Sequence, residues 1–137
     1  MPESGYYEKR PRPEHRKFLL DHLGSRPTVS SVKVIDDFKM EVRRVTQSTI
    51  KVYLTNMYQL GLADVVEILG KAPDTTCIVS TMDYNHFSDE AKEYAKERNV
   101  GLFRARDFLG AVYYDGKKFL EYLSPREREE RARRAGS

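Results

Sequence analysis

The N-terminal part of the chain carries its apolar residues at a helical spacing. Residues 14–23 follow Pro13, a residue favoured at the first position of a helix, and Gly24 comes directly after them. The apolar side chains that share one face of this segment are Phe18, Leu19 and Leu23. We therefore expect a helix over residues 14–23, preceded by a flexible basic arm over residues 1–12, where proline and charged residues predominate.

The spacing then changes to the two-residue period of strands that bury one face. Residues 32–34 and 38–43 alternate apolar with polar side chains. Asp36 and Asp37 between them are common turn residues, and residues 46–49 form the next polar turn. This pattern predicts a β-hairpin followed by a second turn.

The third predicted strand is residues 50–56, with the sequence IKVYLTN. It is rich in β-branched and aromatic residues, which favour strands over helices. It ends on two small polar residues, Thr55 and Asn56. We expect this strand to lie in the centre of a sheet.

The second half of the chain alternates between helical and strand patterns. Leucines and valines recur at helical spacing over residues 60–69 and stop at Gly70. The segments that follow are an apolar strand at 75–80, a helix at 89–98 capped by Ser88, and a strand at 100–103. From residue 49 onward the order strand, helix, strand, helix, strand predicts two crossover connections and a parallel arrangement.

The C-terminal quarter suggests a further hairpin and a charged tail. Residues 111–114 and 117–123 flank Asp115-Gly116, a pair that favours tight hairpin turns. Ser124-Pro-Arg-Glu127 has the pattern of a helix capping box. The tail over residues 124–137 predicts a helix with scarcely any apolar face, either frayed or docked on a partner. Together these patterns predict a single α/β domain over residues 13–123, with a mixed sheet and helices on both faces.

Composition and charge add little to this assignment. The net charge is +3, and the two ends, residues 1–17 and 124–137, each carry a net +2. This basic bias is compatible with a nucleic-acid partner but is too weak to demonstrate one. No apolar run approaches the ~20 residues that span a bilayer, and the N-terminus has no apolar signal core, so we expect a cytoplasmic protein.

The order of the elements, together with a set of short motifs, resembles the restriction-endonuclease-like superfamily, the PD-(D/E)xK nucleases, and is most similar to its Mrr-type branch. That branch has a strand ending in hydroxyl residues, an aromatic residue before a Ser/Thr cap, an alanine-containing helix, a strand, and an Asp before a leucine. The segments that carry the resemblance here are residues 78–81, 87–88, 90–97, 102–103 and 106–109.

The resemblance implies an active site on the second and third strands. The family places an Asp at the start of the second strand, and an acidic residue two positions before a Lys on the third, so that two carboxylates hold Mg²⁺ against the scissile phosphate. Asp37 matches the first position, with Asp36 or Glu41 as substitutes. At the second, the chain has Tyr53 and Thr55, both neutral. A one-residue shift of the strand would turn its apolar side chains out of the core.

We therefore expect a catalytically degenerate nuclease-like module that binds nucleic acid, DNA more readily than RNA, or a protein partner. No cofactor is expected. The cations beside the two strands, which are the candidates for contacting nucleic acid, are Lys39, Arg43, Arg44 and Lys51. Two alternatives stay open: an active Mg²⁺-dependent endonuclease with displaced ligands, in which Asp36 and Asp37 would hold the metal, and an unrelated ligand-sensing α/β domain. The oligomeric state is also open, and a homodimer is one option.

Several candidate residues also have simpler interpretations. Asp36 and Asp37 are explained by a hairpin turn, Glu41 by a solvated cross-strand charge and Glu14 by an exposed helix start. The residues that lack the spacing or company of a zinc site are His15, His22 and His86, although the polar loop of residues 83–86 is the best candidate for a different ligand. Cys77, the only cysteine, lies in an apolar run and is expected to be buried and unreactive. Most of the nine tyrosines could stack on bases, but they are scattered and fit the core or an interface better.

Overall fold

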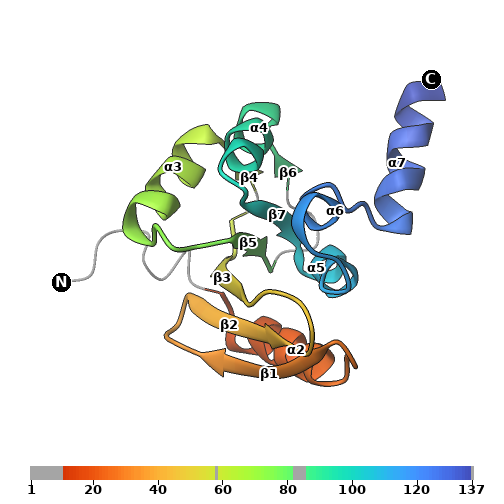
Figure 1. Ribbon diagram of the computed structural model, residues 1–137. Coiled ribbons are helices and arrows are strands. Elements are labelled where there is room, and N and C mark those ends of the chain that lie inside the picture. Colours follow the sequence, from red (N-terminus) through yellow and green to blue (C-terminus); the bar gives the residue numbers. More distant parts are fainter. Residues whose placement is uncertain (1–10, 58, 82–85, 137) are drawn as a thin grey trace.

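The computed structural model describes residues 11–57, 59–81 and 86–136 (Figure 1). In chain order the elements are α2 (Pro13–Gly24), β1 (Val29–Val34), β2 (Lys39–Arg44), β3 (Ile50–Thr55), β4 (Gln59–Leu60), α3 (Leu62–Lys71), β5 (Cys77–Ser80), β6 (His86–Phe87), α4 (Asp89–Glu97), β7 (Gly101–Arg104), α5 (Ala105–Ala111), α6 (Gly116–Leu120) and α7 (Pro125–Gly136). None of the described helices is long and apolar enough to cross a membrane.

A five-stranded mixed sheet with the order β1-β2-β3-β5-β7 forms the centre of the fold. β1, β2 and β3 are an antiparallel meander, whereas β3, β5 and β7 run parallel. A separate small parallel sheet joins β4 and β6. The α/β class, the parallel arrangement after residue 49 and the central place of residues 50–55 are thereby confirmed.

Helices cover both faces of the sheet, as the sequence predicts. On one face, Leu19 and Leu23 of α2 and Phe108 of α5 pack with the inward side chains of β2, β3 and β5. On the other face, the apolar sides of α3 and α4 pack with β5 through a second cluster that contains Val65 and Ala91. Figure 1 shows α2 and α5 on one side of the strands and α3 and α4 on the other. The strands β3, β5 and β7 alternate their side chains between these two clusters, whereas β1 and β2 contribute side chains only to the first cluster.

The helix after β3 begins later than its leucine pattern suggested, and it buries a different face. Leu60 lies in β4, one residue before the N-cap of α3. Val65 and Ile68 are buried, but Leu62 and Val66 are 41% and 44% exposed. The expected apolar set was therefore partly wrong, because α3 packs on α4 along the side that carries Val65 and Ile68. The predicted caps are confirmed: the amide of Ala91 donates to Ser88 Oγ at 3.1 Å, and that of Glu127 to Ser124 Oγ at 3.2 Å.

The predicted hairpin over residues 111–123 is wrong, since this segment forms the end of α5 and the short helix α6. The alternation arose from Val112 and Phe119, which are buried from helical positions and turns. The Asp-Gly pair begins α6 instead of forming a hairpin turn, with Gly116 at a φ of +59°. The carbonyls of Val112 and Tyr114, which a partner strand would have satisfied, accept hydrogen bonds from the buried guanidinium of Arg44.

Candidate nucleic-acid interface

The polar side of the β1-β2-β3 meander faces away from α2 and carries most of the predicted nucleic-acid residues. Met40 and Val42 of β2 point into the cluster beneath α2, so Lys39, Glu41 and Arg43 point to the opposite side. We call this surface the open face; its side chains are Ser31, Lys33, Lys39, Glu41, Arg43, Lys51 and Tyr53.

The cations of the open face are accessible to solvent and close to one another. The side chains of Lys39, Arg43 and Lys51 are 40%, 56% and 44% exposed. The strand register places Glu41 directly between Lys33 and Lys51, and neighbouring strands lie ~4.8 Å apart. Lys39 and Arg43 flank Glu41 on its own strand, each ~7 Å away along the chain. Four cations therefore surround a single carboxylate.

Each of the three predicted cations that lie on the open face has an acidic neighbour within 4 Å. The pairs are Lys39–Asp36 at 3.4 Å, Arg43–Glu41 at 3.9 Å and Lys51–Asp74 at 3.7 Å. Exposed pairs of this kind contribute roughly 0–1 kcal/mol, because water screens both charges. The cations can therefore exchange these neighbours for phosphate groups at little cost.

An aromatic pair borders the cations. Tyr53 lies opposite Lys39 in the register, and its ring stacks on that of Phe38 with centroids 5.6 Å apart and an interplanar angle of 20°. Both rings are half-buried. Aromatic rings beside a basic surface can stack on bases.

The positions that the family resemblance assigns to catalysis lie at one end of β2 and β3. The amide of Leu54 donates to the carbonyl of Phe38 at 2.6 Å, which extends the pairing by one residue beyond β2, and Asp37 precedes Phe38 in the turn between β1 and β2. Tyr53 is one pair further along the ladder. Glu41 lies opposite Lys51, four residues from Asp37. Asp37, Tyr53 and Thr55 thus lie at the same end of the sheet, and Glu41 lies apart from them.

The local contacts of this end differ from those of a cation site. An arginine of α2, Arg16, lies 3.6 Å from Asp37. Thr55 is buried, and its hydroxyl accepts from the amide of Met57 at 3.4 Å. The carboxylate of Asp36 accepts the amides of Phe38 and Lys39 at 2.8 and 2.9 Å, the pattern of a turn formed by an Asp side chain. Within residues 11–57, 59–81 and 86–136, no group of three His, Cys, Asp or Glu side chains could hold a metal ion.

The remaining single candidates lie apart from one another. Glu14 is exposed in the first turn of α2, and His22 packs on Phe18 with ring centroids 4.2 Å apart. His15 is half-buried, and its Nδ1 has no hydrogen-bond partner among the described residues. His86 is exposed on β6, while residues 83–85 of its loop lie outside the described residues. Burial raises the pKa of the Cys77 thiol well above its ordinary value, which leaves it protonated at neutral pH.

Arg44 is placed differently from the other three predicted cations. Its side chain is 1% exposed and points to the α2 side of the sheet. The guanidinium donates to the carbonyls of Ser48, Val112 and Tyr114 and to Asp115, whose Oδ1 is 2.8 Å away. The pKa of Asp115 is lowered, first by the Ser48 hydroxyl that donates to it and also by Arg44. Arg44 therefore joins the sheet to the α5–α6 connection and is not available to a phosphate.

Sequence reasoning missed two residues of this region, Lys33 and Arg16. Lys33 could have been found, because its place in the alternation of residues 32–34 puts it on the polar face beside Glu41. Arg16 carries no such signal, since only the packing of α2 against the sheet brings it to Asp37. Of the exposed tyrosines, Tyr113 and Tyr114 lie in the α5–α6 connection, away from the open face.

No protein-family model matches this chain, and neither a curated protein nor a solved structure matches it. The fold and the open face define it as an α/β protein with an exposed basic sheet surface.

Proposed function

We propose that this chain is a nucleic-acid-binding module that uses the open face, and that it is a catalytically degenerate member of the PD-(D/E)xK superfamily. The observation that carries the proposal is the gathering of Lys33, Lys39, Arg43 and Lys51 on one exposed sheet surface beside Tyr53. DNA is expected ahead of RNA because of the resemblance to nucleases.

The physical basis for binding is the release of counterions. Each Lys or Arg that neutralises a phosphate frees a condensed cation from the nucleic acid, so affinity falls steeply as salt rises. The exposed ion pairs of the open face are weak enough to give way to this exchange. Glu41, which lies among these cations, repels phosphate groups and therefore weakens the binding.

The first prediction is that binding to duplex DNA, measured by gel shift across a salt series, depends on the open face. Replacing Lys39, Arg43 and Lys51 together by glutamine should weaken binding strongly at low salt. The slope of log affinity against log salt should become shallower by ~2–3, because about 0.9 is lost for each phosphate contact on B-DNA. Glu41→Gln should strengthen binding, since it removes the one acidic side chain of the open face.

A matched control changes the same net charge elsewhere. Lys17, Lys118 and Arg133 are exposed on α2, α6 and α7, and their replacement by glutamine should leave affinity and slope nearly unchanged. An equal loss in both triple variants would show binding by overall charge alone. If neither duplex nor single-stranded DNA nor RNA binds at low salt, the proposed function is wrong.

Loss of catalysis is inferred from the charges at the family's motif positions. Asp37 supplies one carboxylate, and Tyr53 and Thr55 supply neither the second acid nor the lysine. A Mg²⁺ ion at Asp37 would also have to compete with the guanidinium of Arg16. A single carboxylate that is already paired with an arginine, with no second acid and no lysine at the motif positions, gives Mg²⁺ little hold.

The second prediction concerns this inferred loss. We expect no Mg²⁺- or Mn²⁺-dependent nicking of supercoiled plasmid, and Asp37→Ala should leave DNA affinity within about twofold of the wild type, a difference of roughly 0.4 kcal/mol. Metal-dependent cleavage by the wild type that disappears in Asp37→Ala would establish the active alternative with displaced ligands. Glu41→Gln and Glu14→Gln would then identify the second carboxylate.

A further inference from the structure

β7 is the edge strand of the sheet on the side opposite to β1, and one row of its backbone groups faces outward. The amide of Gly101 donates to the carbonyl of Thr76 at 3.0 Å, so Gly101 and Phe103 direct their backbone groups toward β5. Because alternate residues of a strand point to opposite sides, the N–H and C=O of Leu102 point away from β5. Among the described residues, neither group has a hydrogen-bond partner.

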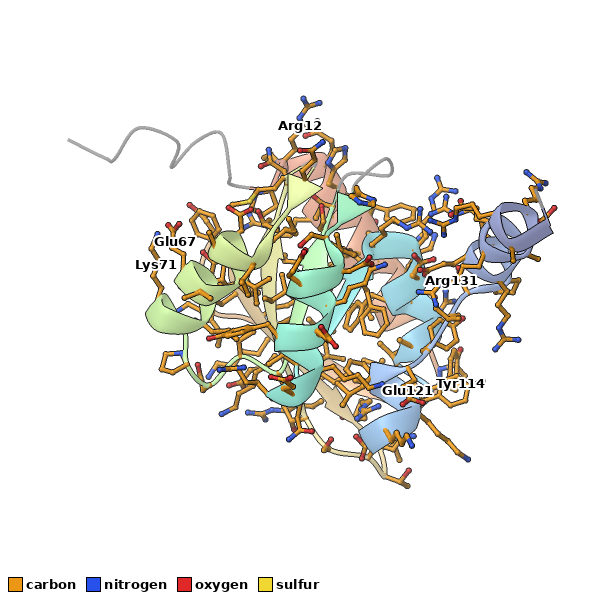
Figure 2. The ribbon with its side chains drawn as sticks, turned by 90° about the horizontal axis from the view of Figure 1, so that it is seen from above. Arg12, Glu67, Lys71, Tyr114, Glu121 and Arg131 are labelled. Atoms are coloured by element: carbon orange, nitrogen blue, oxygen red, sulfur yellow. The ribbon has the colours of Figure 1, made fainter. Side chains whose placement is uncertain are left out.

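A groove of about 310 Å³ runs along this edge, between α4 on one side and α6 and α7 on the other. Leu102 and Phe103 form its floor, Lys92 and Lys96 line the α4 side, and Leu120 and Tyr122 line the α6 side. We call it the β7 groove. In Figure 1, α7 lies at the right, apart from α4, and α6 lies between α7 and β7. Figure 2 shows Glu121 and Arg131, which both line the groove, on the side of the molecule opposite to Glu67 and Lys71 of α3.

The outward backbone groups of Leu102 indicate which kind of ligand the β7 groove can bind. One donor and one acceptor of the same residue, directed to the same side of an edge strand, are satisfied together by the backbone of another extended polypeptide. Natural proteins usually protect such edges with charges, prolines or a covering element. Here α7 flanks the edge, and the groove leaves room beside it.

The residues on the two sides of the groove indicate which side chains that polypeptide should carry. In a strand paired with β7, alternate side chains would lie over the α4 face and the α6 face. Lys92 makes no ion pair with any described residue, and Lys96 is 59% exposed although it lies 3.1 Å from Glu121. The part of the α6 side nearest the floor is apolar, with Leu120 and Tyr122, and charged side chains of Glu121 and of α7 lie around it. Acidic side chains fit the first wall and apolar side chains the second.

The acidic groups of the far wall do not reverse this preference, since each has a cation within 4 Å. The pairs are Glu121–Lys96 at 3.1 Å, Glu127–Arg131 at 3.4 Å and Glu130–Arg104 at 3.8 Å. We infer that the β7 groove binds an extended peptide of a partner protein, in which acidic and apolar residues alternate, as a sixth strand beside β7. This site is separate from the open face and does not depend on the proposed nucleic-acid function.

The test uses the full-length chain and two labelled synthetic peptides, one alternating glutamate with valine and the other lysine with valine. Fluorescence anisotropy should show binding of the glutamate peptide and a preference over the lysine peptide of at least about tenfold. Lys92→Glu combined with Lys96→Glu should reverse the preference. The same change at Lys17 and Lys118, which lie outside the groove, should not.

Variants at Leu102 test the backbone contact directly. Leu102→Pro removes the outward N–H, a change that edge strands tolerate. It should lower the affinity for the peptide about fivefold to tenfold, which is the contribution of one backbone hydrogen bond. Leu102→Ala is the control, because it also loses the leucine side chain but keeps the backbone N–H. It should therefore bind the peptide more tightly than the proline variant does. Circular dichroism checks that both variants fold, and the Leu102 amide of the wild type should exchange more slowly with peptide bound.

Any of three results with the peptides would overturn the inference. These are no binding of either peptide up to about 1 mM, equal affinity for both peptides, or a reversal variant that binds like the wild type. A fourth result would also overturn it. In that case the peptides do not bind, but a single-stranded oligonucleotide binds the wild type and does not bind the Lys92 and Lys96 double variant.

Discussion

Replacing Phe108 by alanine is expected to lower the free energy of unfolding by about 3–5 kcal/mol, because the substitution opens a cavity in the largest core cluster. Phe108 lies in α5, is fully buried and belongs to the cluster that joins α2, α5 and the sheet. Its ring lies 6.3 Å from that of Phe103 on β7. Rigid neighbours on three elements cannot fill the space that the ring would leave.

Urea denaturation followed by circular dichroism measures this loss. Phe108→Leu should cost clearly less than Phe108→Ala, because it keeps most of the buried volume. Tyr113→Ala, at a position that is 45% exposed on the connection after α5, should change stability by no more than about 0.5 kcal/mol. A loss below about 1 kcal/mol in Phe108→Ala would mean that α5 does not pack on the sheet as described.

The second large effect is expected at Arg44. Arg44→Met should destabilise the protein by about 2–4 kcal/mol, since the carbonyls of Val112 and Tyr114 lose their donor and a buried polar group without a partner costs about 1–3 kcal/mol. Asp115 also loses its cation, but its side chain is 46% exposed, so water replaces part of that contact.

The neighbouring arginine provides a matched control. Arg43→Met makes the same chemical change one residue earlier, on a side chain that is 56% exposed on the open face. It should leave the denaturation midpoint nearly unchanged and weaken DNA binding. Arg44→Met should lower the midpoint, and it should leave DNA binding unchanged at temperatures where the protein remains folded. Equal destabilisation by both variants would contradict the buried role of Arg44.

The strands β1 and β2 were predictable because a two-residue period needs no knowledge of the partner, whereas the small sheet of β4 and β6 was not predicted. Met40 and Val42 alternate with Lys39, Glu41 and Arg43, and this alternation alone decides which side of β2 is buried. The caps at Ser88 and Ser124 were predictable for a similar reason, since each depends on residues three positions apart.

The segment over residues 111–123 was not predictable in this way. Its alternation and its Asp-Gly pair favour a hairpin locally, yet Val112 and Phe119 are buried from helices and turns. The deciding contacts are the hydrogen bonds from Arg44 to the carbonyls of Val112 and Tyr114, which lie 68 and 70 residues away in sequence. Interactions between residues so far apart leave no periodic signal in the sequence.

The sequence by itself determined the α/β class, the meander followed by parallel strands, and the absence of an acid and a lysine at positions 53 and 55. Tertiary structure alone decided that Arg44 meets the carbonyls of Val112 and Tyr114, and that Arg16 meets Asp37. It also decided that β7 is an edge strand beside a groove. The reason is that local periodicity specifies which face of an element is apolar, whereas the neighbour that each polar group meets depends on how the elements pack.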